Sequence, residues 1–154
     1  MITLAPLPWP EGHTVAHLAP FPDQIKFAGT VDDILREPPA RFDLHQILDN
    51  NIPVGVFKID RAYSQSFPFA ASTDIGLRAL IVDACAQGKG VAKAAMSQLA
   101  AHLAPLYQHA PHVYLTVNFE NHAAFAVYKS AGFETTGEIW PHGISPQHVM
   151  RLPL

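Results

Sequence analysis

The feature that most constrains the fold is an apolar strand that runs through a glycine turn directly into a helix. Residues 75–82 end in Leu80-Ile81-Val82, an apolar run expected of a strand that is covered on both faces. Gly88 and Gly90 interrupt this run, and apolar side chains then recur every four residues over 91–103, which predicts a helix. A strand followed at once by a helix is typical of domains in which helices pack against a sheet.

Further elements are predicted on both sides of this unit. Asp49-Asn50-Asn51 separates two β-rich runs and predicts a hairpin turn. Thr30 is placed to cap a helix that must end before Pro38-Pro39. The expected order is an irregular lead-in (1–12), a first strand (14–18), a helical front (23–37), the hairpin (41–59), a strand (75–82), a helix (91–103), a strand (112–117), a helix (121–131) and two closing strands (133–139 and 148–152). This order predicts an α/β (α+β) domain with a mixed sheet.

Length and composition limit the class of protein. A chain of 154 residues is expected to form one domain, residues 1–154. A net charge of −3 argues against strong attraction to nucleic acid or to an anionic membrane. The single cysteine, Cys85, and the lack of a secretory leader or a long apolar run fit a cytoplasmic protein. His13 and His17 lack the intervening residues of a metal motif, so no metal site is expected.

The glycine turn is a candidate phosphate site. A turn of this kind exposes successive backbone N–H groups at a helix start, and such groups bind phosphate. The alternative is a plain connection between a strand and a helix. A Walker A loop does not fit, because Asp83 stands where its first glycine belongs and Gly90 where it needs Ser or Thr. A Rossmann fingerprint does not fit either, because Lys93 occupies its third glycine position.

A second candidate lies on the helix predicted over 121–131. Asn121 and Tyr128 are seven residues apart, which places an amide and a phenol on nearly the same helix face. The alternative is that Asn121 only caps the helix and that Tyr128 is a half-buried core residue.

Together the two motifs resemble those of the GNAT superfamily of N-acetyltransferases. The pyrophosphate loop of that family, Q/R-x-x-G-x-G/A, is matched by Gln87-Gly88-Lys89-Gly90-Val91-Ala92. A later motif, N-x-x-A-x-x-x-Y-x-x-x-G-F, is matched by Asn121, Ala124, Tyr128, Gly132 and Phe133. The segment around Gln24 and the Asn-rich hairpin are similar to the spermine/spermidine-acetyltransferase branch.

The resemblance implies a fold, a cofactor and a set of site residues. The fold would be a central mixed, mostly antiparallel twisted sheet of six to seven strands flanked by about four helices. The cofactor would be acetyl-CoA. In this family, main-chain groups of a strand bind the acetyl-pantetheine arm of the cofactor, and the corresponding residues here are Leu80, Ile81 and Val82. The glycine loop binds the pyrophosphate, and it corresponds here to Gln87, Gly88, Lys89, Gly90, Val91, Ala92 and Lys93. An amide, here Asn121, contacts the cofactor arm, and a phenol, here Tyr128, faces the sulfur as general acid.

The implied activity is transfer of an acetyl group to a primary amine by direct attack on a thioester. A phenol with pKa ~10 can protonate a departing thiolate of pKa ~8.5 without itself being ionised at neutral pH. The expected acceptor is a small-molecule amine such as a polyamine. The alternatives are a protein N-terminus or lysine, and a non-catalytic acyl-CoA-binding module.

Two further expectations concern the base and the assembly. An amine that is protonated at neutral pH needs a base, and the candidates left open are Asp60, Asp74, Glu120, Glu138 and His148. A homodimer is expected because Phe67, Phe69 and Trp140 fall in predicted loops or element ends, where apolar side chains often mark an interface. The alternative is that these three side chains line the acceptor pocket.

Overall fold

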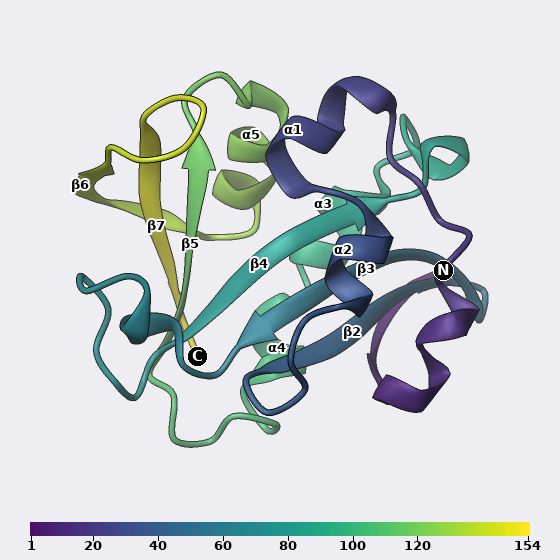
Figure 1. Cartoon of the computed structure of the whole chain (residues 1–154), viewed down its shortest axis with the longest axis horizontal. Helices are drawn as coiled ribbons and strands as arrows, with labels where there is room; N and C mark the ends of the chain where they lie inside the picture. Colours follow the sequence, from purple (N-terminus) through teal and green to yellow (C-terminus); the bar gives the residue numbers. More distant parts are fainter.

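The computed structural model describes all residues from 1 to 154 (Figure 1). Its centre is one seven-stranded sheet with the order β1-β2-β3-β4-β5-β7-β6. Neighbouring strands are antiparallel except β4 and β5, which are parallel. The strands are β1 Ile2–Leu7, β2 Phe42–Asp49, β3 Ile52–Asp60, β4 Ile75–Val82, β5 His112–Asn118, β6 Glu134–Trp140 and β7 Gln147–Pro153. The predicted mixed, mostly antiparallel sheet is therefore confirmed.

Five helices flank the sheet: α1 Ile25–Ala28, α2 Val31–Leu35, α3 Val91–Met96, α4 Leu99–Leu103 and α5 His122–Ser130. The helix predicted over 91–103 is divided at Ser97 and Gln98. The Ser97 hydroxyl donates to the Ala94 carbonyl at 2.7 Å, and Gln98 N–H bonds three residues back to Ala95. Such bonds tighten and bend a helix. This division accounts for five helices where about four were predicted.

The N-terminal prediction was wrong in two places. Residues 2–7, expected to be irregular, form the edge strand β1, which tolerates Pro6 because it pairs with β2 on one side only. Residues 14–18, expected to be a strand, contain no strand. Thr14 is the last residue of a 3-10 helix, Trp9–Thr14, and a turn follows it. Val15 and Leu18 are nevertheless buried in the core. Their apolar pattern therefore reflects burial in a turn.

The local capping and turn predictions are confirmed. Thr30 Oγ1 accepts from Asp33 N–H at 3.1 Å, and Asp33 accepts from Thr30 N–H at 3.0 Å, which forms a capping box for α2. Asn50 and Asn51 both have positive φ, 49° and 69°, as a tight hairpin turn requires.

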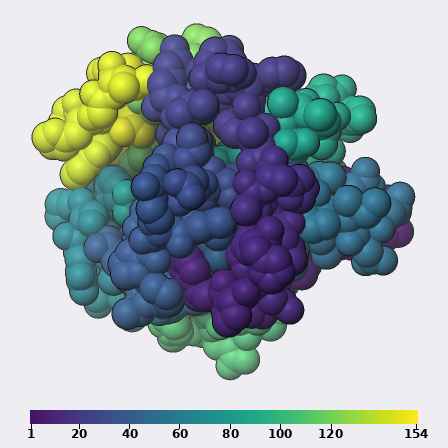
Figure 2. All heavy atoms as spheres, turned by 45° about the vertical axis from the view of Figure 1, so that its right-hand side comes forward, coloured from purple at the N-terminus to yellow at the C-terminus, as the bar shows by residue number.

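Helices cover both faces of the sheet. In Figure 1, α1 and α2 lie in front of the sheet, and α3 and α4 lie behind it. The rear core joins α3, α4 and α5 to side chains such as Phe57 and Leu77, whereas the front core joins α2 to Val56 and Ile81. The space-filling view shows how N-terminal segments, in purple and blue, cover one side of the molecule (Figure 2). None of the helices has the length and apolar character that crossing a membrane requires.

One seam of the sheet is short. β4 and β5 pair only at Ile75–Val113 and Gly76–Tyr114, whereas β5 and β7 pair along seven residues. Beyond Gly76, β4 continues to pair with β3 on its other side but has no partner on the side of β5. The sheet therefore has an opening near its middle.

Candidate active site

The main cavity of the protein lies at this opening and has a volume of about 740 Å³. Residues 77–82 of β4 and 115–118 of β5 line it. Residues from α3 and α5, which belong to the rear core, also line it. Further lining comes from α1, from the aromatic segment after β3 and from the segment after β6. The cavity is thus bordered by elements from both sides of the sheet.

The glycine turn contributes unpaired backbone donors to this cavity. Gly88 and Gly90 have φ of 79° and 76°, a region that other residues adopt at a cost. A Cβ atom at either position would meet nothing within 4 Å, so the space beside the turn is open. The six successive N–H groups from Gly88 to Lys93 have no acceptor within the protein. Six orphan donors around an open space are suited to a polyanionic group such as a pyrophosphate.

Side-chain amides hold the turn in place. Gln87 and Gln24 exchange two hydrogen bonds, of 2.7 and 2.8 Å, and Gln87 Nε2 also donates to the Val82 carbonyl at 2.9 Å. Gln24 precedes α1, so the pair ties the front of the molecule to the glycine turn. Gln87 therefore fixes the path of the loop, which leaves ligand contact to the backbone groups that follow it.

A bulge shapes the β4 side of the cavity. The register with β3 passes from Val56–Ile81 to Lys58–Arg78, so two residues of β4 oppose one residue of β3. Ala79, in the bulge, has a φ of 58°, a strained value for a residue with a Cβ. Leu80, the second bulge residue, and Ile81 and Val82 after it all line the cavity.

The α5 candidates face the same cavity. Asn121 caps α5 through its Oδ1, which accepts from Ala124 N–H at 3.3 Å, and it also lines the cavity. Tyr128 is buried and lines the cavity, and its hydroxyl makes no hydrogen bond within the protein. Burial raises the pKa of Tyr128 above its ordinary value, so its hydroxyl keeps its proton.

Of the residues that the resemblance assigns to the cofactor and to the general acid, the structure brings all but Lys89 to the wall of one cavity. Lys89 lies within the glycine turn but does not line the cavity. Phe67 and Trp140 line the cavity, as the pocket alternative for them expected. Lining residues outside all the sequence predictions are Lys58, Tyr63, Arg78 and His142. One signal for them was available, because Arg78 is a lone charge within an otherwise apolar strand.

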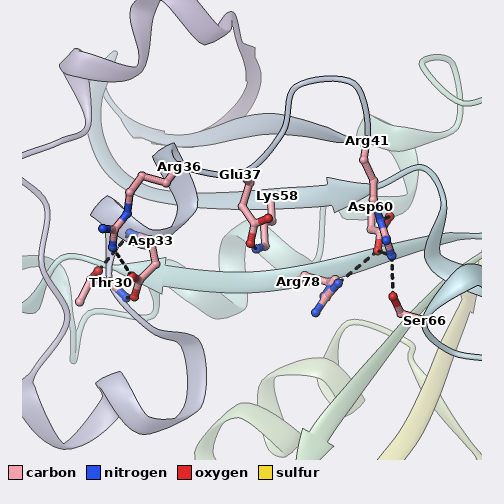
Figure 3. Close-up of polar contacts among 9 residues, drawn as sticks. All are labelled: Thr30, Asp33, Arg36, Glu37, Arg41, Lys58, Asp60, Ser66 and Arg78. Atoms are coloured by element: carbon pink, nitrogen blue, oxygen red, sulfur yellow. Dashed lines mark hydrogen bonds and ion pairs between the residues drawn. The ribbon is translucent and has the colours of Figure 1, made fainter.

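Charged groups cluster around Lys58 and Arg78 on the cavity wall, a region named here the front end of the cavity (Figure 3). Asp60 is fully buried and accepts two hydrogen bonds of 2.8 Å from Arg41. Arg78 Nη1 also contacts Asp60 Oδ2, one of the two oxygens that Arg41 binds, at 3.3 Å. Burial raises the pKa of Asp60, but the bonds from Arg41 and from Ala62 N–H outweigh it, so the net pKa is lowered. Asp60 is therefore ionised and already neutralised.

Lys58 is the second cation at this end. Its side chain is 8% exposed, and its Nζ contacts Glu37 Oε1 at 2.5 Å. Burial lowers the pKa of Lys58, and the pairing with Glu37 partly opposes this. Neither Glu37 nor Asp60 lines the cavity, and no other Asp or Glu does so.

The five candidate bases all lie off the cavity wall. Asp60 is held by Arg41, and Asp74 is buried with His112 Nδ1 at 3.4 Å. His148 stacks on Phe119, and Glu120 and Glu138 are exposed. His142 is the one imidazole that lines the cavity.

The aromatic residues that suggested an interface pack on one another instead. Phe67 lies 5.7 Å from Phe69 and 5.1 Å from Trp140 between ring centroids, and Tyr63 and Tyr114 complete this cluster. Phe67 is 9% exposed. Phe67 and Trp140 line the cavity together with Tyr63, so these side chains no longer support a dimer.

The chain matches the model of the acetyltransferase (GNAT) family over residues 3–133. It therefore belongs to the GNAT family, and its class of activity is acyl transfer. The family uses acetyl-CoA as its acyl donor. No curated protein matches the chain.

Solved structures share the fold at low sequence identity. An aminoglycoside acetyltransferase in complex with coenzyme A and kanamycin has a TM-score of 0.78 and 17% identity, and the match covers 99% of this chain and 95% of that one. The spermidine N-acetyltransferase of Vibrio cholerae, in complex with coenzyme A and spermine, has a TM-score of 0.72, 14% identity and the same coverage. The ribosomal-protein-S18-alanine N-acetyltransferase of Escherichia coli has a TM-score of 0.68 and 19% identity, covering 99% and 94%.

Proposed function

We propose that the protein transfers an acetyl group from acetyl-CoA to the primary amine of a small molecule. One observation carries this proposal: the orphan N–H groups of the glycine turn and the Tyr128 hydroxyl border the same cavity. The first feature suits a pyrophosphate, and the second suits a leaving thiolate.

The residues present fit the cofactor. The N–H groups from Gly88 to Lys93 would hold its pyrophosphate, and the unpaired edge of β4 from Leu80 to Val82 would hold its amide-containing arm. Asn121 would contact the arm from α5. When bound, acetyl-CoA supplies the thioester that an amine can attack.

Tyr128 would act as the general acid. Its Oη has no acceptor within the protein, and its raised pKa keeps the proton available at neutral pH. A thiol has an ordinary pKa of ~8.5, so at neutral pH the protonated thiol is favoured over the free thiolate. A proton donated from Oη therefore assists departure of the thiolate.

His142 is the best placed proton acceptor. It lines the cavity on the segment after β6, beside Trp140, whose ring centroid is 4.9 Å away. An imidazole takes a proton from an ammonium group more readily than any other side chain on this wall.

The cavity supports a small acceptor over the alternatives. A volume of about 740 Å³ is in the usual range for small-ligand sites, although a protein terminus could enter it. A polyamine is the acceptor suggested by the sequence resemblance, but a wall without Asp or Glu weighs against a polycation. A non-catalytic binding module would not require a phenol at the sulfur.

Two measurements test the proposal. Thermal unfolding with acetyl-CoA at 100 times its Kd should show a stabilisation of about 2.7 kcal/mol. A panel of amines, assayed by release of free thiol, should contain an acceptor. Failure of both would overturn the proposed function, whereas binding without any acceptor would favour the non-catalytic module.

Three broader proposals accompany this function. Strands from both ends of the chain share one sheet, which supports a single N-acetyltransferase domain over residues 1–154. Ile139 and Ile144 are 52% and 55% exposed beside the edge strand β6, which supports a homodimer through that edge. Light scattering would test the dimer. The lone Cys85, exposed and unpaired, supports a cytoplasmic location.

A further inference from the structure

We infer that the acceptor amine carries a carboxylate, and that Arg78 binds it. The inference rests on the proposed function and deepens it by naming the class of acceptor. It begins with the charges at the front end of the cavity, where three cations meet two carboxylates. Arg41 and Arg78 share Asp60, and Lys58 pairs with Glu37. One positive charge is therefore not compensated within the protein.

That charge resides on Arg78. Arg41 makes the two short bonds to Asp60, whereas Arg78 contacts Asp60 through one nitrogen at 3.3 Å. The remaining N–H donors of Arg78 have no acceptor in the protein, although the residue lines the cavity. Figure 3 shows Asp60 between Arg41 and Arg78, with Lys58 and Glu37 alongside. An arginine with free donors on a cavity wall is suited to binding an anion.

Packing fixes the guanidinium of Arg78. Its Cζ lies 5.3 Å from the centroid of the Phe67 ring and 5.7 Å from that of Phe42. Neither ring accepts a hydrogen bond from Arg78, so its N–H groups other than the one on Asp60 remain free. A planar guanidinium with free N–H groups matches the two oxygens of a carboxylate. A single excess charge matches a carboxylate better than a phosphate monoester, which carries about −1.5 to −2 at pH 7.

The position of Arg78 sets the scale of the acceptor. Arg78 lies two residues before Leu80, the first residue proposed to hold the cofactor arm, so their backbones are at most about 7 Å apart, and the bulge at Ala79 shortens this span. An amine at the thioester and a carboxylate at Arg78 therefore fit within a molecule as small as an amino acid. Tyr63, Phe67 and Trp140 on the same wall favour an apolar or aromatic remainder.

The test compares acceptors that differ only in the anionic group. Phenylalanine, leucine and methionine are assayed beside their carboxamides, with spermidine and kanamycin as polycations. An amide lowers the pKa of the neighbouring amine, so a bias from amine basicity acts against the expected preference. We expect kcat/KM for a free amino acid to exceed that of its amide by at least about tenfold, as for a hydrogen bond to a charged group.

Variants assign the preference to Arg78. Arg78→Gln should lower kcat/KM for the carboxylate-bearing acceptor by about 10- to 100-fold and change that for the amide less than threefold. Arg78→Lys should restore part of the preference. Arg36→Gln is the matched control, because Arg36 is 68% exposed and pairs only with Asp32 and Asp33 outside the cavity. A readout without chemistry is competitive inhibition by 3-phenylpropanoate, which Arg78→Gln should weaken by the same factor.

The outcomes separate this inference from the proposed function. Acetylation confined to spermidine, kanamycin or the amides overturns the carboxylate inference and leaves the acetyltransferase proposal standing. A carboxylate preference that persists in Arg78→Gln overturns the role of Arg78. A protein that acetylates no amine in the panel overturns both.

Discussion

The Nδ1 atom of His45 lies 2.9 Å from the Nε2 atom of His102, in a buried chain of hydrogen bonds between β2 and α4. The other ring nitrogen of His45 lies 3.0 Å from the Tyr107 hydroxyl, which donates to Asp43 at 2.7 Å. Because Tyr107 donates to Asp43, His45 must donate to Tyr107 and accept from His102. This direction requires a neutral His45, whose pKa burial and the nearby His102 lower to about 3.

The hydrogen bonds around His45 predict that the stability of the protein falls in acid. The pKa of His45 is about 3 in the folded protein, whereas the ordinary pKa of histidine is 6.5, so the unfolded protein binds more protons as the pH falls below 6.5. The stability contributed by neutral His45 is complete above pH 6.5 and is lost as the pH falls toward 3. Between pH 6.5 and 5 the free energy of unfolding should fall by about 2 kcal/mol from this group alone. Urea unfolding at the two pH values measures it.

His45→Phe keeps an aromatic ring against Phe57, on which His45 stacks at 5.1 Å, but cannot titrate. Its free energy of unfolding should be lower at pH 6.5, because partners are lost, and should change less between the two pH values. An equal pH dependence in the variant would show that the sensitivity comes from other groups.

Tyr128→Phe should lower kcat by about 10²–10⁴-fold, as removal of a general acid does. The Tyr128 hydroxyl has no hydrogen bond within the protein, so the free energy of unfolding and the affinity for coenzyme A should change little. Tyr107→Phe is the control, because its hydroxyl bonds His45 and Asp43 away from the cavity. That variant should lose about 1–3 kcal/mol of stability and keep its kcat. A normal kcat in Tyr128→Phe, with chemistry rate-limiting, contradicts the general-acid role.

Gly90→Val should raise the Kd for coenzyme A by at least about tenfold, equivalent to the loss of one or more hydrogen bonds from the turn. A branched side chain would enter the open space beside the N–H groups, and a φ of 76° strains any residue with a Cβ. Gly137→Val controls for that strain, because Gly137 has a φ of 89° and equally open surroundings on β6, outside the cavity. Equal affinities in the two folded variants would remove the pyrophosphate assignment.

Asp60→Asn should lower the free energy of unfolding by about 3–5 kcal/mol, because it leaves the partly buried Arg41 without its partner. Asp32→Asn removes a carboxylate that is 79% exposed and paired with Arg36, and it should change stability by less than about 1 kcal/mol. Chemical denaturation compares the two. A small effect at Asp60 would mean that the cluster does not depend on this ion pair.

His142→Asn should lower kcat/KM, because a carboxamide cannot take a proton from the acceptor amine as an imidazole does. The affinity for coenzyme A should not change. A variant with an unchanged kcat/KM would show that solvent or another group takes the proton.

The sequence predicts this site where the chemistry is local. Gln87 to Lys93 and Asn121 to Tyr128 are each continuous segments whose spacing specifies a turn or a helix face, and the structure brings them to one cavity. Arg78, His142 and Phe67 reach the same cavity from separate segments. Their convergence depends on strand order and on the bulge at Ala79, which no local pattern specifies.

The fold shows the same division. The hairpin at Asn50-Asn51 and the cap at Thr30 follow from backbone preferences of the residues themselves. β1 does not, because a strand that contains Pro6 forms only when a neighbouring strand offers it an edge. For the aromatic side chains around Phe67 the sequence leaves an interface and a pocket wall equally open, because sequence alone does not show which loops fold back on each other.

The short seam between β4 and β5 also bears on aggregation. Unpaired strand edges attract other chains, and most proteins keep such edges short, charged or covered at their perimeter. Here two unpaired edges, beyond Gly76 and beyond Tyr114, face a common interior space instead of the outside. Another polypeptide strand would have to enter between them, whereas a slender chain with amide groups could do so. The molecule thus keeps backbone hydrogen-bonding capacity for a ligand without presenting it to its neighbours in a crowded solution.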